Sequence, residues 1–195
     1  ELPTDIHLLI FTDYCEDIDL QMMKNIGSYF RNLIVEHFPE IKVSLAEICS
    51  NGYVNILEWI DDHKKINWLE SECDYINHAT YGGHLHVMKW LDSKNAKLDP
   101  EHYSAAAEIN NLDIMKWLKD KNVTIPNDIF DLAAEFGNIE MLEWLKENGC
   151  TFTNRTSASA AYSGSLEKLK WLHANSCSFN EETFCYASCK DDLEN

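Results

Sequence analysis

Cysteine and histidine side chains near the end of the chain are of the types that bind zinc. Cys185 and Cys189 are separated by three residues and would share one face of a helix, and His173 and Cys177 precede them. The places corresponding to Cys185 and Cys189 hold an alanine and a tyrosine in a similar segment earlier in the chain. Packing within a repeated unit therefore accounts for these side chains, and we expect neither a metal nor a cofactor.

The histidines of His84-x-His86 could in principle bind a metal or act as a general base. His84 follows a glycine, however, at a place that is polar in the similar segments, where it is Asn111, Asn138 or Ser165. We interpret it as an exposed histidine at a helix start. The chain has no serine-protease order of residues, phosphate-binding glycine loop or zinc-hydrolase motif, so we do not expect an enzyme.

A regular spacing of tryptophans is the strongest pattern in the sequence. Four of the six tryptophans have residue numbers that differ by 27 from one to the next, namely Trp90, Trp117, Trp144 and Trp171, and a fifth, Trp59, precedes them by a slightly longer interval. Self-similarity at a period of about 20–50 residues indicates a repeat architecture. Such an array is more suited to presenting a surface than to enclosing a catalytic pocket.

Each repeated unit has the pattern of two short helices. A glycine or asparagine stands two turns before each tryptophan, where positive φ would end the first helix, at Gly52, Gly83, Asn110, Gly137 and Gly164. Paired alanines precede this turn in several units and would let neighbouring backbones approach closely. The residues after the turn form a wide apolar helical stripe, as in Ile139, Leu142, Trp144 and Leu145. Helices of about nine residues are unstable alone, so stacking must hold them.

The pattern predicts an all-α fold: an array of about five helix pairs plus a partial sixth. We expect pairs near 43–62, 74–93, 101–120, 128–147 and 155–174, and a single helix near 181–189. Leu193 follows Leu166 by the same interval as the tryptophans, so the second helix of the sixth unit would begin there, and we expect that the array is truncated and the natural protein continues. Trp90, Trp117 and Trp144 should be largely buried between second helices.

The repeat resembles the ankyrin repeat. The resemblance rests on Ala-Ala-x-x-Gly-x-(Leu/Ile)-x-x-Leu-x-x-Leu, which matches residues 133–145, and it covers roughly residues 43–195. Ankyrin units usually have about 33 residues and open with Thr-Pro-Leu-His; here the opener is absent and the unit is shorter, which implies that the projecting hairpins are reduced to loops. The Lys/Glu-Trp-Leu core is similar to short ankyrin repeats of giant DNA viruses and some protists. The resemblance implies an ankyrin-like helical solenoid.

Residues 1–40 lie outside the repeat and have the pattern of three short helices. Pro3 suits the first position of a helix, and Asp17 or Asp19 could cap a second helix. A break at Gly27-Ser28 leads into a third, which would close before Pro39. We expect a small three-helix head.

This head resembles an F-box, with Leu-Pro at its start and Phe-Arg near its end. The resemblance implies docking to a Skp-type adaptor through apolar residues of the head: Leu2, Pro3, Ile6, Ile10, Phe11, Leu20, Ile26 and Phe30. The alternative is a plain helical cap that shields the first repeat, since terminal repeats need a polar outer face. One structure could serve both purposes.

The composition excludes several classes of partner. With 195 residues and a net charge of −17, the chain would repel the phosphates of nucleic acid and attract a basic protein face. No apolar run approaches the roughly 18 residues that a membrane-spanning helix needs, so we expect no membrane span. Seven cysteines suggest buried thiols in a reducing compartment, because equivalent places in a stack are about 10 Å apart and too far to bridge. We expect the protein to be located in the cytoplasm or in the nucleus. If the protein is viral, this cytoplasm is the cytosol of the host cell.

Side chains just before each turn vary between units, where the core does not. By resemblance to ankyrin they would lie near the groove that binds partners, and we predict that a basic protein or peptide binds there: the residues are Tyr81, Glu108, Asp131, Glu135, Phe136 and Tyr162. The alternative is that the aromatic ones pack against the neighbouring first helix.

The two resemblances together imply a substrate receptor of a cullin-type (SCF-like) ubiquitin ligase. The head would dock the Skp-type adaptor, and the repeats would bind the target protein. The alternative function is an ankyrin-like scaffold or binding protein with no role in ubiquitin transfer, whose head acts only as a cap.

Overall fold

The computed structural model describes residues 45–64 and 74–191, and their regular structure is helical. Within those two ranges there are eleven helices and no strand, so the all-α class is confirmed for them. The helices are α4 (Leu45–Ser50), α5 (Val54–Lys64), α6 (Tyr75–Tyr81), α7 (Leu85–Ser93), α8 (Glu101–Glu108), α9 (Leu112–Asp120), α10 (Ile129–Phe136), α11 (Ile139–Glu147), α12 (Thr156–Tyr162), α13 (Leu166–Ala174) and α14 (Glu181–Asp191). The eight residues assigned to an adaptor surface lie outside the described residues.

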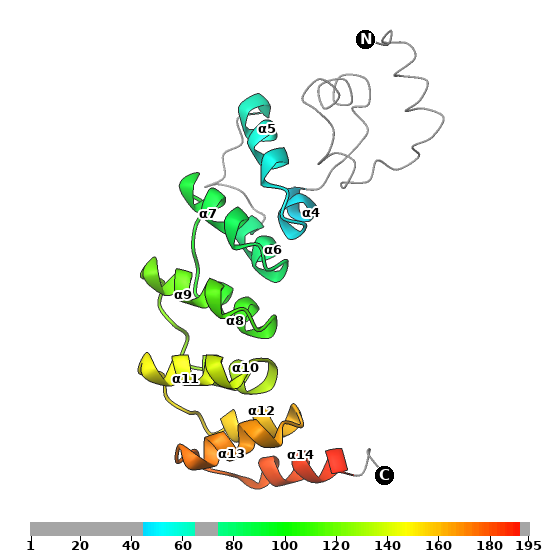
Figure 1. Cartoon of the computed structure of the whole chain (residues 1–195), viewed down its shortest axis with the longest axis vertical. Helices are drawn as coiled ribbons and strands as arrows, with labels where there is room; N and C mark the ends of the chain where they lie inside the picture. The colour runs from blue at the N-terminus through cyan, green and yellow to red at the C-terminus, as the bar shows by residue number, and fades with distance from the viewer. Residues whose placement is uncertain (1–44, 65–73, 192–195) are drawn as a thin grey trace, which may run out of the picture.

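The helices follow one another as antiparallel pairs, and the pairs lie one above another from α4 and α5 to α14 (Figure 1). The first helix of each pair packs against the first helix of the next, in the order α4, α6, α8, α10, α12 and α14. Each first helix from α4 to α12 also contacts the second helix of its own pair. A layer of first helices therefore runs along the molecule, and side chains at the same place in successive units come close together.

Small side chains make this close packing of first helices possible. The paired alanines are at most 1% exposed in three successive first helices: Ala106 and Ala107, Ala133 and Ala134, and Ala160 and Ala161. A larger side chain at any of them would push the backbones apart. The expectation that alanines permit a close approach is confirmed in these helices.

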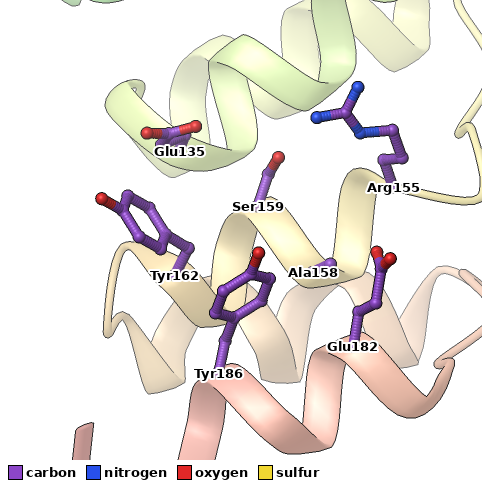
Figure 2. A pocket seen from close by; sticks show the side chains of 7 residues that line it. All are labelled: Glu135, Arg155, Ala158, Ser159, Tyr162, Glu182 and Tyr186. Carbon is purple, nitrogen blue, oxygen red and sulfur yellow. The ribbon is translucent and has the colours of Figure 1, made fainter. Parts of the chain in front are cut away.

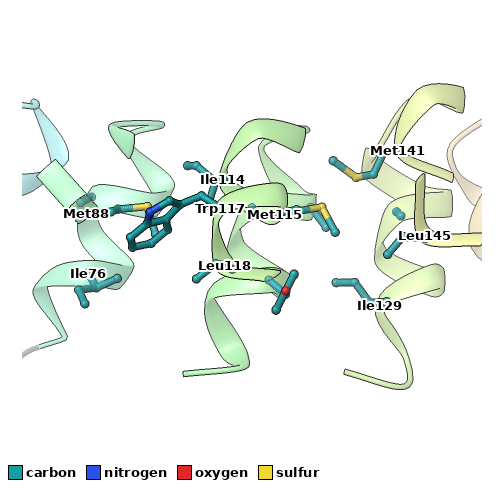
Figure 3. Packing of buried hydrophobic residues seen from close by; sticks show 14 of the residues in the cluster. Ile76, Met88, Ile114, Met115, Trp117, Leu118, Ile129, Met141 and Leu145 are labelled. Atoms are coloured by element: carbon teal, nitrogen blue, oxygen red, sulfur yellow. The ribbon is translucent and has the colours of Figure 1, made fainter. Parts of the chain in front are cut away.

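The second helices supply larger apolar side chains to the same core. Four leucines of the motif are fully buried, one in each of α7, α9, α11 and α13: Leu91, Leu118, Leu145 and Leu172. Methionines fill the remaining space between the pairs, and Figure 3 shows Trp117 pointing from α9 toward Met88 of α7. The core is thus continuous from one pair to the next.

The tryptophans differ in how deeply they lie in this core. Trp117 is buried, with 9% of its surface exposed, as predicted. Trp90 and Trp144 are only half-buried, so for them the predicted burial was too strong. At the outer edge of the second helices a lysine ammonium lies over each of the three rings, at 5.3 Å for Trp90, 5.8 Å for Trp117 and 6.0 Å for Trp144.

Four of the five predicted turn residues have positive φ, namely Gly52, Gly83, Asn110 and Gly164. Gly137 does not, and the prediction was wrong there, because its φ is −75°. A Cβ at Gly137 would lie 2.7 Å from the Ala133 carbonyl oxygen and 2.8 Å from the Met141 sulfur. Glycine is needed at this turn because a side chain would collide with its neighbours, and not because the backbone has a positive φ.

Polar side chains fix the start of the second helices. The side-chain oxygens of Asn111, Asn138 and Ser165 each accept a hydrogen bond from the backbone N–H three residues further on. This is the bond that stabilises a helix N-terminus, commonly by about 1 kcal/mol. His84 holds the same place in α7 without such a bond, while His86 bonds through Nε2 to the Gly52 carbonyl oxygen at 2.9 Å. The histidine pair thus lies against the preceding turn.

Ion pairs at equivalent places link successive second helices. The Lys94 ammonium lies 2.5 Å from Asp61, and one unit later the Lys121 ammonium lies 2.6 Å from Asp92. Further along, the polarity reverses, because Lys146 takes the place of the aspartate and bonds to the Asn175 side-chain oxygen. Partly exposed pairs of this kind contribute modest stability each. In the first two contacts the lysine belongs to the later unit, and in the third it belongs to the earlier unit, so the contacts differ between neighbouring units.

Lys168 is a charged residue at a core place, which the sequence analysis did not identify. Its counterparts in the other units are apolar: Ile56, Val87, Ile114 and Met141. Lys168 is 6% exposed, and its ammonium donates to the carbonyl oxygens of Glu135 at 2.8 Å and Gly137 at 3.3 Å. Burial lowers the pKa of the Lys168 ammonium, although the Glu135 charge acts in the opposite direction. The lysine therefore completes the carboxyl end of α10 from the next unit.

We expect Lys168→Ala to lower the free energy of unfolding by about 2–4 kcal/mol, since it leaves both carbonyl oxygens without the ammonium and opens a cavity. Lys168→Met, which copies Met141 and fills the space, should cost about 1–2 kcal/mol. Urea unfolding of both variants and the unmodified chain measures this. A methionine variant as stable as the unmodified chain would show that the two bonds add no net stability.

Candidate functional site

Four of the six residues predicted to bind a target lie in one row. Tyr81, Glu108, Glu135 and Tyr162 hold the same place in successive units, in the last turns of α6, α8, α10 and α12. Because these helices pack side by side in this order, the four side chains follow one another along the layer of first helices. We call these four residues the ladder. Tyrosines stand at its two ends and glutamates between them.

The first two members of the ladder are joined directly. The Tyr81 hydroxyl donates a hydrogen bond to Glu108 Oε2 at 3.0 Å, although 49% of the tyrosine is exposed. Partial burial raises the pKa of the Tyr81 hydroxyl, and the bond to the Glu108 carboxylate and its charge raise it further. The hydrogen bond to the carboxylate therefore orients the phenol along the surface.

Phe136 lies beside the ladder, one residue after Glu135. It is the last residue of α10, and 46% of its surface is exposed. Its counterpart one unit earlier, Ile109, is half-buried and packs against the core. Phe136 thus places an apolar ring on the surface beside a carboxylate, which is the combination expected of a binding anchor.

The structure does not bring Asp131 to the ladder. Asp131 is in the first turn of α10, at the opposite end of the helix from Glu135 and Phe136. Its carboxylate accepts hydrogen bonds from the Thr153 hydroxyl at 2.8 Å and from the Thr156 hydroxyl at 2.6 Å. These bonds tie α10 to the loop before α12 and to the first residue of α12, so Asp131 has an internal role.

A polar hollow of about 260 Å³ lies between α10, α12 and α14 at the end of the ladder (Figure 2). Its lining residues are Glu135, Arg155, Ala158, Ser159, Tyr162, Glu182 and Tyr186. The Tyr162 and Tyr186 rings meet edge to face, with centroids 5.5 Å apart and an interplanar angle of 80°. Figure 2 shows Glu135 and Tyr162 at one end of the hollow and Arg155 and Glu182 at the other.

Sequence reasoning found two of these seven residues and missed the rest. It considered only the residues next to the turn, whereas a helix also presents on the same face the residue one turn earlier. Ser159 stands one turn before Tyr162, and Tyr186 holds the place of Ser159 in the next unit. Extending the ladder by that spacing would have identified both of them.

A second, apolar hollow of about 370 Å³ lies on α13 and α14 and includes Leu166 and Phe184. Phe184 is 62% exposed, whereas its counterparts in the earlier first helices are at most 2% exposed: Ile76, Tyr103, Phe130 and Ser157. In each of the earlier pairs a second helix follows and contacts the first helix. No helix within residues 74–191 has that place on α14.

The cysteines and histidines do not form a metal site in the part of the chain that the structure describes. Cys177 is buried, whereas Cys185 and Cys189 are exposed on α14. Among the described residues no group of three or more histidine, cysteine, aspartate or glutamate side chains is placed to hold an ion. None of the described helices is long and apolar enough to cross a membrane.

No protein-family model matches the chain, and no curated protein matches it. Its function is therefore argued from the geometry and charge of the ladder and the polar hollow.

His102 is a titratable side chain that the fold encloses completely. It is fully buried in α8, and neither ring nitrogen has a hydrogen-bond partner, although Nε2 lies 3.8 Å from the Asp74 carboxylate. Its counterpart Ile129 is equally buried. Burial lowers the pKa of His102, against the attraction of Asp74 and Asp99. The ring lines neither of the two hollows, so the neutral imidazole acts as a packed side chain of the core.

Because the folded chain holds His102 neutral, the unfolded chain takes up this proton first as the pH falls. The stability that depends on the neutral ring is therefore complete above the ordinary histidine pKa of about 6.5 and is lost as the pH falls from there to the lower folded-state pKa. We expect the urea midpoint of the unmodified chain to fall between about pH 7.5 and about pH 5.5.

The variant His102→Ile, which copies Ile129, should lose less stability over this pH range. The exposed His173, substituted by Gln, is the control and should leave the decline unchanged. An equal decline in His102→Ile and in the unmodified chain would assign the pH dependence to other groups.

Proposed function

We propose that this chain is a protein-interaction module whose helix pairs are units of an ankyrin-like solenoid. Support comes from the constant spacing of the second helices, because α7, α9, α11 and α13 begin at Leu85, Leu112, Ile139 and Leu166, at the same interval as the tryptophans. The packing of each first helix on the next is the arrangement that stacked repeats use to bury a continuous core.

The observation that carries the binding function is the exposure of aromatic rings at the ends of the first helices. Tyr81, Phe136 and Tyr162 are each about half exposed, whereas Ile76, Ile129 and Phe130 of the same helices are at most 2% exposed. Tyrosine in particular is enriched among the residues that dominate binding energy at protein interfaces. None of the three is needed to fill the core, so a partner surface is the role that explains them.

The charge of the chain favours a basic partner. The net charge is −17, and Glu108 and Glu135 stand between the aromatic residues of the ladder. Complementary charge speeds association and rejects acidic partners, while the aromatic contacts contribute more to affinity. The ladder therefore suits a protein or peptide with basic side chains.

The role of residues 1–40 rests on their resemblance to an F-box. With that head docked on a Skp-type adaptor, the solenoid would present its target to a cullin-type ubiquitin ligase, in the cytoplasm or the nucleus. The alternative is a scaffold whose head only caps the array. Adaptor binding separates the two functions.

If the head docks an adaptor, replacing Leu2 and Pro3 together with Ala should weaken binding of a purified Skp-type adaptor at least about tenfold, because apolar residues form the core of such interfaces. The thermal midpoint should change little. Titration calorimetry with the full chain measures the affinity. The same double substitution at the exposed Glu143 and Glu147 of α11 is the control. An unmodified chain that shows no adaptor binding at tens of micromolar supports the scaffold function instead.

If a target binds at the ladder and Phe136, Phe136→Ala should weaken the binding of a captured partner by about 2 kcal/mol. Glu135→Ala should weaken the same binding by about 1 kcal/mol or less. Affinity should also fall as salt rises, because screening weakens attraction between exposed charges. Surface plasmon resonance at low and high salt measures both effects, with Glu140→Ala on α11 as the control. Equal and salt-independent affinities for all these variants would place the site elsewhere on the molecule.

A further inference from the structure

We propose that the polar hollow between α10, α12 and α14 binds the cationic side chain of an arginine or lysine of the partner. This inference rests on the proposed function, because it assigns a chemical specificity to one end of the ladder. The hollow exists because α12 has short side chains there, Ala158 and Ser159. The corresponding places of α10 hold Asp131 and Leu132, which would occupy the same space.

Two tyrosines supply a surface for the cation. Tyr162 and Tyr186 come from neighbouring helices and meet edge to face at 5.5 Å, and both are exposed. An ammonium or guanidinium placed over a tyrosine face is attracted by about 0.5–1 kcal/mol at an exposed site, and arginine can also stack on it.

The charges of the hollow fix the direction of the bound side chain. Glu135 stands at the end with Tyr162, and Arg155 stands at the other end beside Glu182 (Figure 2). None of the ion pairs within the described ranges includes Glu135, Arg155 or Glu182. A cation would be repelled by Arg155 and attracted to the Glu135 end, while the guanidinium of Arg155 can donate to a carbonyl oxygen of the partner's backbone.

Lys168 does not already fill this place. Its ammonium lies beneath the end of α10 and bonds to the main-chain oxygens of Glu135 and Gly137. It forms none of the ion pairs seen in the described part of the chain, so the Glu135 carboxylate remains available.

The size of the hollow also favours one side chain over a small-molecule ligand. Its volume is about 260 Å³, below the range of about 300–1,000 Å³ that is usual for small-molecule pockets. Its lining is mainly polar and charged, whereas small-molecule sites are mostly apolar.

The test is an NMR titration of the full chain with two blocked tripeptides, acetyl-Gly-Arg-Gly-amide and acetyl-Gly-citrulline-Gly-amide. Citrulline has nearly the shape of arginine without its charge. We expect the arginine peptide, at millimolar concentration, to shift the backbone amide signals of Ser159, Tyr162 and Tyr186 in a saturable way, and the citrulline peptide to leave them unchanged. Equal shifts with both peptides, or none with either, overturn the proposal.

Matched variants separate the hollow from the general acidity of the surface. Glu135→Gln and Tyr186→Ala should each lower the affinity for the arginine peptide about threefold to tenfold. Tyr186→Phe, which keeps the ring, should retain the affinity. Glu108→Gln and Tyr81→Ala change the same kinds of residue in earlier units, away from the hollow, and should have no effect. Equal weakening by these controls overturns the proposal.

The outcome for the hollow can be told apart from the outcome of the Phe136 test. If the tripeptide fails to bind while Phe136→Ala still weakens a captured partner, the hollow is rejected and the interaction module stands. If the tripeptide binds as expected but no partner depends on Phe136, the hollow stands and Phe136 is rejected as an anchor for the target.

Discussion

The burial of one helix pair against the next is the interaction on which the rest of this structure depends. Short helices of two to three turns, such as α6 and α7, are not stable alone in water. They are held by the alanines that let first helices touch and by the leucines, methionines and Trp117 that fill the space behind them. Stability therefore comes from the neighbours of each pair, and a defect at one junction weakens both sides of it.

That constraint separates the residues that must be kept from those that can change. The Ala133-Ala134 pair and Leu142 face other helices, whereas Glu135 and Phe136, which directly follow the alanines, face outward. A substitution at the outward places leaves the stack intact. The repeat thus provides a row of side chains close together in space, with a chemistry that is independent of the core, which suits recognition of a protein surface.

The sequence predicted the helices of the described residues because their pattern repeats, and each unit supported the same boundaries. Glycines, paired alanines and the tryptophan spacing placed α8 to α13 close to their observed ends. It failed where one unit departs from the others for a reason outside itself. Lys168 is explained only by the carbonyl oxygens of Glu135 and Gly137 in the preceding unit, and the polar hollow only by three helices together. Such features depend on which units are neighbours in space.

The departures gather at the same end of the chain. Gly137 adopts a turn unlike the others, Lys168 binds that turn from the next unit, and α12 has alanine and serine where a longer side chain would close the surface. A buried ammonium and an open hollow both cost stability compared with an apolar, filled junction. Glu135 connects them, because its carbonyl oxygen accepts from Lys168 while its side chain lines the hollow. A junction shaped only for stability would resemble the preceding one, between α8 and α10, where the apolar Met141 stands at the position that corresponds to Lys168. The cost is therefore best explained by the surface that this junction presents at the end of the ladder.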